Sequence, residues 1–210
     1  MSLHSRLFAA LYDPFFQRAE RAGLSDRRRA LVAEARGRVL EIGAGTGLNL
    51  RHYPETVEEL VLTEPEDAMA RKLEGKLRDL SRRGRVVRAS AERLPFDDDS
   101  FDTAVATFVL CTVDHPEQVL SELQRVLRPG ARFLFLEHVR ADSPGLARWQ
   151  DRLHGPWLIF GNGCHCNRPT PATLEASGLA VERMDRDRLE KMPPLVQPIV
   201  TGSAAAPAPA

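Results

Sequence analysis

The chain has 210 residues, of which 43% are hydrophobic and 28% charged, the composition of an ordinary globular protein. Lys plus Arg and Asp plus Glu both number 29, so the net charge is formally zero and the basic excess typical of nucleic-acid-binding proteins is missing. Three cysteines argue against a disulfide framework, and no apolar run reaches the ~20 residues that span a bilayer. We therefore expect a cytoplasmic monomer or homodimer without a signal peptide, membrane span or nucleic-acid partner.

Short apolar runs alternate with helical patterns along the chain, which predicts a parallel sheet with helices on both faces. The first run, residues 38–42 (RVLEI), ends in a glycine-rich turn. Further strands are predicted at residues 60–63, 85–89, 101–107 and 132–136, and weaker ones at residues 179–184 and 198–202. The order of elements is that of a doubly wound α/β sheet, in one domain over residues 1–202.

Two helices between these strands carry signals for where they begin and end. Pro65 suits a first helical position, and an apolar stripe follows it at Met69, Leu73, Leu77 and Leu80. Residues 119–127 repeat this pattern, and Pro129 and Gly130 are expected to end that helix.

Segments outside this alternation are expected to cover the sheet and to form walls of a binding site. Residues 1–30 are predicted to form a helical cap, with the basic run Arg27–Arg29 on a solvated face. Residues 142–173 are predicted to form a lid after the fifth strand, because ligands of open α/β sheets bind beyond the carboxyl ends of the strands. Residues 203–210 are small residues and proline, and we expect them to be disordered.

The most informative motif is the stretch VLEIGAGTG at residues 39–47. Its glycines, Gly43, Gly45 and Gly47, follow a strand and lead into a short predicted helix at residues 48–53, so the backbone can turn sharply and approach a ligand closely. Glu41 stands two residues before the first glycine, where a carboxylate would repel a pyrophosphate but suits an ammonium and a sulfonium. The pattern predicts a cationic cofactor without phosphate.

A second acidic residue, Glu64, ends the second predicted strand, 21 residues after Gly43. At this position a carboxylate can accept hydrogen bonds from both hydroxyls of a ribose. Alternatively, Glu64 only precedes a helix. Its register with Glu41 and the glycines favours the ribose role.

Residues 31–139 carry the motifs LEIGAGTG, TEPE, ASAERLPFDDDSFD and VLRPG, and this region resembles the class I S-adenosylmethionine-dependent methyltransferases, the broad type that includes ubiquinone/menaquinone C-methyltransferases. The resemblance implies a Rossmann-like, mostly parallel seven-stranded sheet with its last strand antiparallel, and S-adenosylmethionine as cofactor. It places adenine in the loop at residues 89–94, where Ser90 replaces the family's usual Asp, and the methionine part near Thr107 and Phe108. The expected cofactor residues are Glu41, Gly43, Ala44, Gly45, Gly47, Asn49, Glu64, Pro65, Ser90, Ala91, Glu92, Thr107, Phe108 and Cys111.

A narrower set of motifs resembles the methyltransferase-like proteins that methylate alkyl thiols. It includes ATFVLCTVDHPEQVLSELQRVLRPG and FLEHV, and it extends into the predicted lid with WQD, GPW and Gly163–Cys164. This resemblance implies S-methylation of a small, apolar thiol. Two alternatives remain open: O-, N- or C-methylation of a natural product, quinone or phospholipid headgroup, and a non-catalytic cofactor-binding protein.

A thiol reacts as its thiolate, so a base near the acceptor would help. His138, just past the fifth strand, is the first candidate base and His115 the second, with a structural role as the alternative for each. The candidate substrate-binding residues are Tyr12, Trp149, Trp157 and Arg168. The run Cys164-His165-Cys166 lacks the paired ligands of a tetrahedral zinc site, so no metal is predicted.

Overall fold

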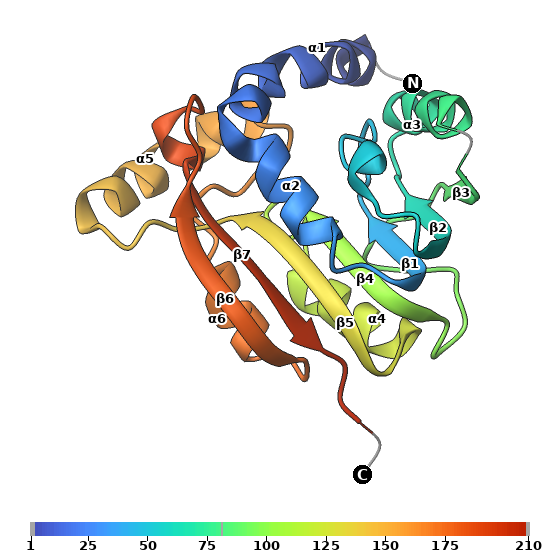
Figure 1. Ribbon diagram of the computed structural model, residues 1–210. Coiled ribbons are helices and arrows are strands. Elements are labelled where there is room, and N and C mark those ends of the chain that lie inside the picture. The colour runs from blue at the N-terminus through green and yellow to red at the C-terminus, as the bar shows by residue number, and fades with distance from the viewer. Residues whose placement is uncertain (1–2, 81, 209–210) are drawn as a thin grey trace.

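The computed structural model describes residues 3–80 and 82–208, and within this part of the chain seven strands form one sheet, in the order β3-β2-β1-β4-β5-β7-β6 (Figure 1). The strands are β1 Gly37–Ile42, β2 Val57–Thr63, β3 Gly84–Val87, β4 Phe101–Thr107, β5 Leu127–His138, β6 Ala180–Arg188 and β7 Pro198–Ala205. The pairs β1–β2, β1–β4, β2–β3 and β4–β5 are parallel, whereas β7 runs antiparallel to β5 and β6. The expected mostly parallel sheet with an antiparallel last strand is confirmed.

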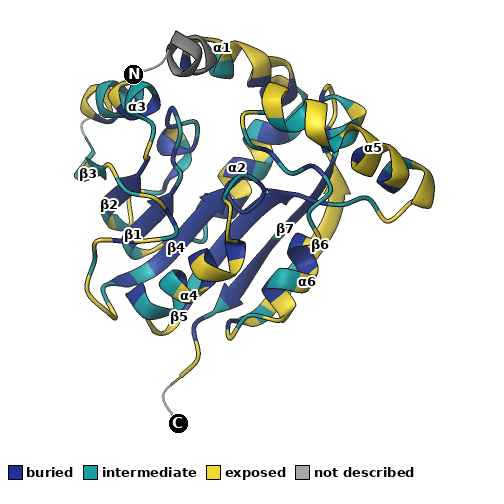
Figure 2. Ribbon diagram, turned by 180° about the vertical axis from the view of Figure 1, so that it is seen from behind, coloured by how far each residue is buried: buried dark blue, intermediate teal, exposed yellow. Residues whose placement is uncertain are grey.

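Helices cover both faces of this sheet (Figures 1 and 2). The helical elements are α1 Leu3–Ala19, η1 Glu20–Leu24, α2 Ser25–Val32, η2 Leu50–His52, α3 Asp67–Asp79, α4 Pro116–Val126, α5 Pro144–Phe160, α6 Thr170–Glu175 and η3 Pro194–Val196. The first face is covered by α2 and α3 and the second by α4 and α6, whereas α1 crosses above the carboxyl ends of the parallel strands.

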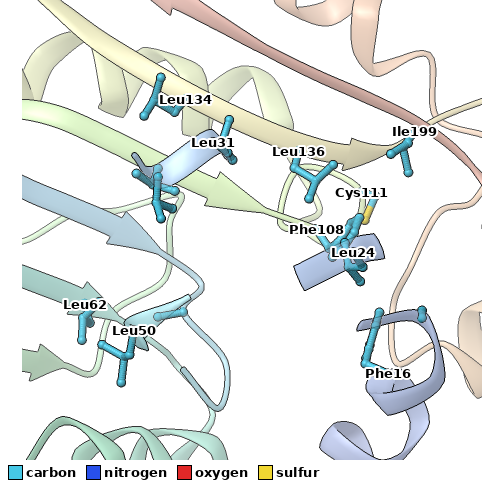
Figure 3. Packing of buried hydrophobic residues seen from close by; sticks show 14 of the residues in the cluster. Phe16, Leu24, Leu31, Leu50, Leu62, Phe108, Cys111, Leu134, Leu136 and Ile199 are labelled. Carbon is cyan, nitrogen blue, oxygen red and sulfur yellow. The ribbon is translucent and has the colours of Figure 1, made fainter. Parts of the chain in front are cut away.

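The hydrophobic core has two layers because successive residues of a strand point to opposite faces of a sheet. Val39 of β1 belongs to the cluster beneath α2 and α3, and its neighbour Leu40 belongs to the cluster beneath α4 and α6. Figure 3 shows part of the first cluster, including Leu31 of α2 and Leu134 of β5. Strands buried on both faces read as continuous apolar runs, which is why they were visible in the sequence.

Several element boundaries differ from the sequence-based expectation. The helix expected after the glycine-rich turn is a single 3-10 turn, η2. Helix α3 begins at Asp67 rather than Pro65, because the side chain of Glu66 caps it by accepting a hydrogen bond from the backbone N–H of Ala68.

The prediction of disorder from residue 203 onward is wrong for the first residues of that tail. Strand β7 continues to Ala205, which lies opposite Arg132 of β5. Ala206 is buried and exchanges backbone hydrogen bonds with the chain around Ala131. Directly before this tail, Gly202 passes so close to Phe135 and the Arg183 backbone that a Cβ would clash.

The topology places a ligand site where the strand order reverses. β1 lies between β2 and β4, so the loops that follow β1 and β4 leave the sheet in opposite directions and open a crevice at the carboxyl ends of these two strands.

No helix in the part of the chain described by the structure has both the length and the apolar character needed to cross a membrane.

Candidate functional site

A cavity of about 560 Å³ lies at this crevice, between the sheet, α1 and the end of α5. Most of its wall is apolar. The expected cofactor residues that line it are Gly43, Gly45, Glu64, Pro65, Ser90, Ala91, Phe108 and Cys111. Of the other candidates, Tyr12, Trp157 and His138 line it too.

The glycine-rich turn forms the cavity wall next to β1. Gly43, Gly45 and Gly47 have φ values of 55°, 58° and 81°, a backbone conformation that residues with a side chain rarely adopt. A Cβ at Gly43 would lie 2.7 Å from Val109, and one at Gly47 would lie 2.7 Å from Leu50, so close packing requires these two glycines. A Cβ at Gly45 would meet no atom within 4 Å. Gly45 therefore faces open space, which leaves its backbone accessible to a ligand.

Glu64 holds the turn in place from the end of β2. Its Oε2 accepts a hydrogen bond from the backbone N–H of Gly45 at 2.9 Å, and its Oε1 accepts one from the backbone N–H of Glu66 at 2.9 Å. Burial raises the pKa of this carboxyl above its usual 4.5. Each oxygen keeps a further lone pair for a ligand.

Glu41 lies behind the turn rather than on the wall of the main cavity. Its carboxylate accepts hydrogen bonds from Asn49 Nδ2 and the Tyr53 hydroxyl, both at 2.8 Å. Burial raises its pKa from 4.5 to about 7. Together with Asn49, Ala44 and Thr107, Glu41 lines a smaller pocket that shares Tyr12 and Gly43 with the main cavity.

Arg28 extends this polar network, and the expectation that it lies on a solvated helix face is wrong. The residue is 2% exposed and pairs with the carboxylate of Glu20 at 2.8 Å. Its Nη1 donates to Asn49 Oδ1 at 3.1 Å and to Thr107 Oγ1 at 3.0 Å. A buried arginine with three acceptors fixes α2 against the floor of the site.

The loop after β3 contributes Ser90 and Ala91 to the cavity but not Glu92. The Glu92 carboxylate accepts a hydrogen bond from the backbone N–H of His115 at 2.7 Å and so fixes the start of α4. His115 itself is exposed and lies outside the cavity wall. Neither Glu92, an expected cofactor residue, nor His115, the second candidate base, is among the residues that line the cavity.

Phe108 and His138 form a stack on the opposite wall. Their ring centroids are 4.2 Å apart, with 15° between the planes, and Phe108 has a φ of 61°. His138 is buried, its Nδ1 has no hydrogen-bond partner in the described structure, and burial lowers its pKa from 6.5 to about 3. The imidazole is therefore neutral at physiological pH and can accept a hydrogen bond.

Glu137, the residue before His138, positions the loop that follows β4. Its carboxylate accepts hydrogen bonds from the backbone N–H groups of Val109, Leu110 and Cys111 at 2.9, 3.0 and 3.3 Å. Burial raises its pKa from 4.5 to about 7. One carboxylate thus fixes three consecutive peptide groups in the cavity wall.

The candidate substrate residues divide into two groups. Tyr12 of α1 and Trp157 of α5 line the cavity. Trp149 does not, because it lies on the outer side of α5 and is 55% exposed. Arg168 donates hydrogen bonds to the carbonyls of Leu110 and Val113, so its guanidinium supports the loop rather than facing the cavity.

Comparisons with known proteins agree with this geometry. A family profile described as a methyltransferase domain matches residues 40–135. Thiol S-methyltransferase TMT1B of Rattus norvegicus is 33% identical over 160 residues, which cover 74% of this chain and 63% of the rat protein, less than two thirds of its length. The protein of the same name from Homo sapiens is 32% identical over 197 residues, covering 86% and 79%. The chain belongs to the class I S-adenosylmethionine-dependent methyltransferases.

A solved structure shows the same fold for this methyltransferase. A SAM-dependent methyltransferase from Thermotoga maritima superimposes with a TM-score of 0.71 at 23% identity, covering 98% of this chain and 100% of that chain. The cofactor of the family is S-adenosylmethionine, and the site fits it. The open space at Gly45 admits the cofactor next to the backbone, and the Glu64 carboxylate has lone pairs for ribose hydroxyls.

Two residues of the methyltransferase site were missed by the sequence analysis. Arg28 was hidden in a basic run, whose members look equally solvated until the helix is placed. Glu137 left a clearer signal, because a carboxylate directly after the apolar run RFLFL must find donors if the strand is buried.

Proposed function

We propose that this protein transfers the methyl group of S-adenosylmethionine to a small apolar thiol. The observation that carries the proposal is His138, a buried residue of the wall of an apolar cavity whose Nδ1 has no hydrogen-bond partner in the described structure. Such a site favours a neutral, largely apolar acceptor. Glu64 is the only formally charged residue among the described residues that line the cavity, and it belongs to the cofactor side.

The bound cofactor supplies a methyl group already activated on a sulfonium, so the residues of the chain mainly bind, orient and exclude water. Gly43, Gly45 and Glu64 would hold the nucleoside part, with Ser90 and Ala91 next to the adenine. Tyr12 and Trp157 would enclose the apolar part of the acceptor. His138 Nδ1 would accept a hydrogen bond from the acceptor thiol and orient its sulfur.

The low pKa of His138 makes it a hydrogen-bond acceptor and a weak base. The rate of transfer should therefore follow ionisation of the thiol itself, whose pKa in an apolar alkyl thiol lies above the value of roughly 8.5 for the cysteine side chain, because electron-withdrawing groups are missing. We expect kcat/KM to rise with pH through that region, without a histidine inflection near the usual value of ~6.5. An inflection that disappears in His138→Phe would contradict this assignment.

The decisive experiment is methyl transfer from labelled S-adenosylmethionine to separate panels of thiols, phenols, amines and phospholipid vesicles. Label on apolar thiols is expected. Label confined to phenols, amines or lipids would overturn the thiol proposal and keep the methyltransferase. The absence of label from every panel would overturn catalysis by this chain and favour a cofactor-binding protein.

Substitution of His138 tests its role in positioning the acceptor. His138→Phe retains a ring for the stack on Phe108 but removes the Nδ1 acceptor. Since a neutral hydrogen bond contributes about 1 kcal/mol, kcat/KM should fall roughly three- to tenfold. The affinity for S-adenosylhomocysteine, measured by calorimetry, should not change. His115→Phe is the matched control, because that side chain is exposed away from the cavity.

A further inference from the structure

Two cysteines from distant parts of the chain meet on the wall of the cavity. Cys111 lies in the loop after β4, and Cys164 lies in the loop between α5 and α6; their sulfur atoms are 3.9 Å apart. Both side chains are buried, and both line the cavity. Figure 3 shows Cys111 near Phe108, at the end of the β4 segment. The third cysteine, Cys166, does not line the cavity, and its Sγ lies 3.9 Å from the Gln150 carbonyl oxygen.

The backbone holds the two cysteines in register. The N–H of His165 donates to the carbonyl of Cys111 at 2.7 Å, and the N–H of Cys164 donates to the carbonyl of Gly161 at 3.2 Å. A disulfide bond is ~2.05 Å long, so a small movement of the side chains, rather than a change of fold, would bring the two sulfur atoms within bonding distance.

The two thiols are chemically unequal. The hydrogen bond between the sulfur atoms lowers the pKa of Cys164. The same hydrogen bond, together with burial, raises the pKa of Cys111. Cys164 is also the more accessible of the two, 6% exposed against 0% for Cys111, so we assign it the first attack and Cys111 the second.

We propose that Cys111 and Cys164 form a dithiol site that exchanges with small apolar disulfides in the acceptor part of the cavity. The Cys164 thiolate attacks one sulfur of R–S–S–R, forms a Cys164–S–S–R bond and releases the first R–S⁻, which takes up a proton. Cys111, as its thiolate, then attacks the Cys164 sulfur and releases the second R–S⁻, which is protonated in turn. The dithiol is oxidised by two electrons to a disulfide, and R–S–S–R is reduced to two R–SH molecules.

This inference deepens the proposed function, because the exchange would generate a thiol acceptor inside the pocket. Only this use of the exchange rests on the proposed function; the exchange reaction itself does not. A small dithiol reductant would return the protein to its starting state. The apolar wall of the cavity selects against charged disulfides. Exchange itself requires no S-adenosylmethionine, so its success or failure is independent of methyl transfer.

The test uses the full chain, fully reduced and without cofactor, mixed with 2,2′-dithiodipyridine as an apolar aromatic disulfide. We expect two thiopyridone molecules released per chain and a protein that has lost two hydrogens by intact mass. Oxidised glutathione, which is charged, should react at least tenfold more slowly. Proteolytic mapping of the oxidised protein should recover Cys111 and Cys164 in one linked pair of peptides.

Serine variants separate the two steps. Cys111→Ser should stop at one released thiopyridone, with the other thiopyridyl group attached to the protein, and Cys164→Ser should lose the fast reaction. Cys166→Ser is the matched control and should behave as wild type. The proposal is overturned if wild type reacts only after denaturation, if mapping finds another pair, or if Cys164→Ser reacts at the wild-type rate.

Methyl transfer to pre-reduced thiols, assayed separately with reductant present, tests the proposed function. Disulfide exchange without methyl transfer would support the dithiol site and overturn the proposed function. Transfer without exchange would overturn the dithiol site alone.

Discussion

Glu64→Gln is expected to weaken cofactor binding by roughly 10- to 100-fold while the chain stays folded. The carboxylate holds the backbone N–H groups of Gly45 and Glu66, both at 2.9 Å, and its remaining lone pairs are available to ribose hydroxyls. A glutamine keeps one carbonyl oxygen but presents an amide NH₂ in place of the other acceptor. At least one hydrogen bond to a charged group is lost, which costs about 1.5–3 kcal/mol. A tenfold change in affinity corresponds to about 1.4 kcal/mol, which gives the stated range.

The assay is calorimetric titration with S-adenosylhomocysteine, accompanied by thermal unfolding without ligand. Glu66→Gln is the matched control, because that side chain caps α3 and does not line the cavity. Since burial raises the pKa of Glu64, wild-type affinity should also fall as the pH is lowered through that pKa, and the variant should lack this dependence. If the affinity of Glu64→Gln were within about twofold of wild type, the free-energy difference would be well below that of one hydrogen bond to a charged group, and the reasoning would be refuted.

Further variants test the turn and the buried network beneath it. Gly45→Ala places a methyl group in the cavity and should reduce the affinity for S-adenosylhomocysteine at least tenfold in calorimetry. Gly47→Ala places a methyl group 2.7 Å from two leucines and should instead lower the free energy of unfolding in urea by about 1–3 kcal/mol. Arg28→Ala leaves a buried carboxylate unpaired and should cost about 3–5 kcal/mol, against less than ~0.5 kcal/mol for the exposed Arg29→Ala. The pKa of Glu41 is raised from 4.5 to about 7, so the folded state keeps a proton that the unfolded state has lost. The contribution of Glu41 to the free energy of unfolding is therefore complete below pH 4.5 and is lost as the pH rises to about 7, a fall of roughly 3 kcal/mol. Glu41→Gln should remove this fall. An unchanged dependence of the unfolding free energy on pH in the variant would contradict the assignment.

Local signals in the sequence were sufficient to predict the glycine-rich turn and the acidic residue beside it. The turn from Gly43 to Gly47 and the acid at Glu64 depend on backbone geometry at the ends of two adjacent strands, and both are continuous in sequence. The strands themselves were visible because burial on two faces requires apolar runs. The tail from residue 203 onward was misassigned because alanine has little strand propensity, so nothing local indicated that β7 continues to Ala205.

The contacts between distant segments could not be predicted in the same way. Nothing local separates buried Arg28 from exposed Arg29, which differ only in the direction they leave α2. Trp149 and Trp157 are eight residues apart on one helix, yet only Trp157 lines the cavity. The approach of Cys111 to Cys164 depends on how the loop after α5 returns to the end of β4.

Glu137 shows how such distant segments are joined into one site. Its carboxylate fixes the peptide groups of Val109, Leu110 and Cys111. Val109 packs against Gly43, so this loop also bears on the glycine turn of the cofactor side. Cys111 lines the cavity, and so does His138, the residue after Glu137. Because this buried carboxylate at the end of β5 holds the loop after β4, the shape of this part of the cavity is set by the sheet. We therefore expect acceptor specificity to depend on α1 and the segment after β5, which form other walls of the cavity.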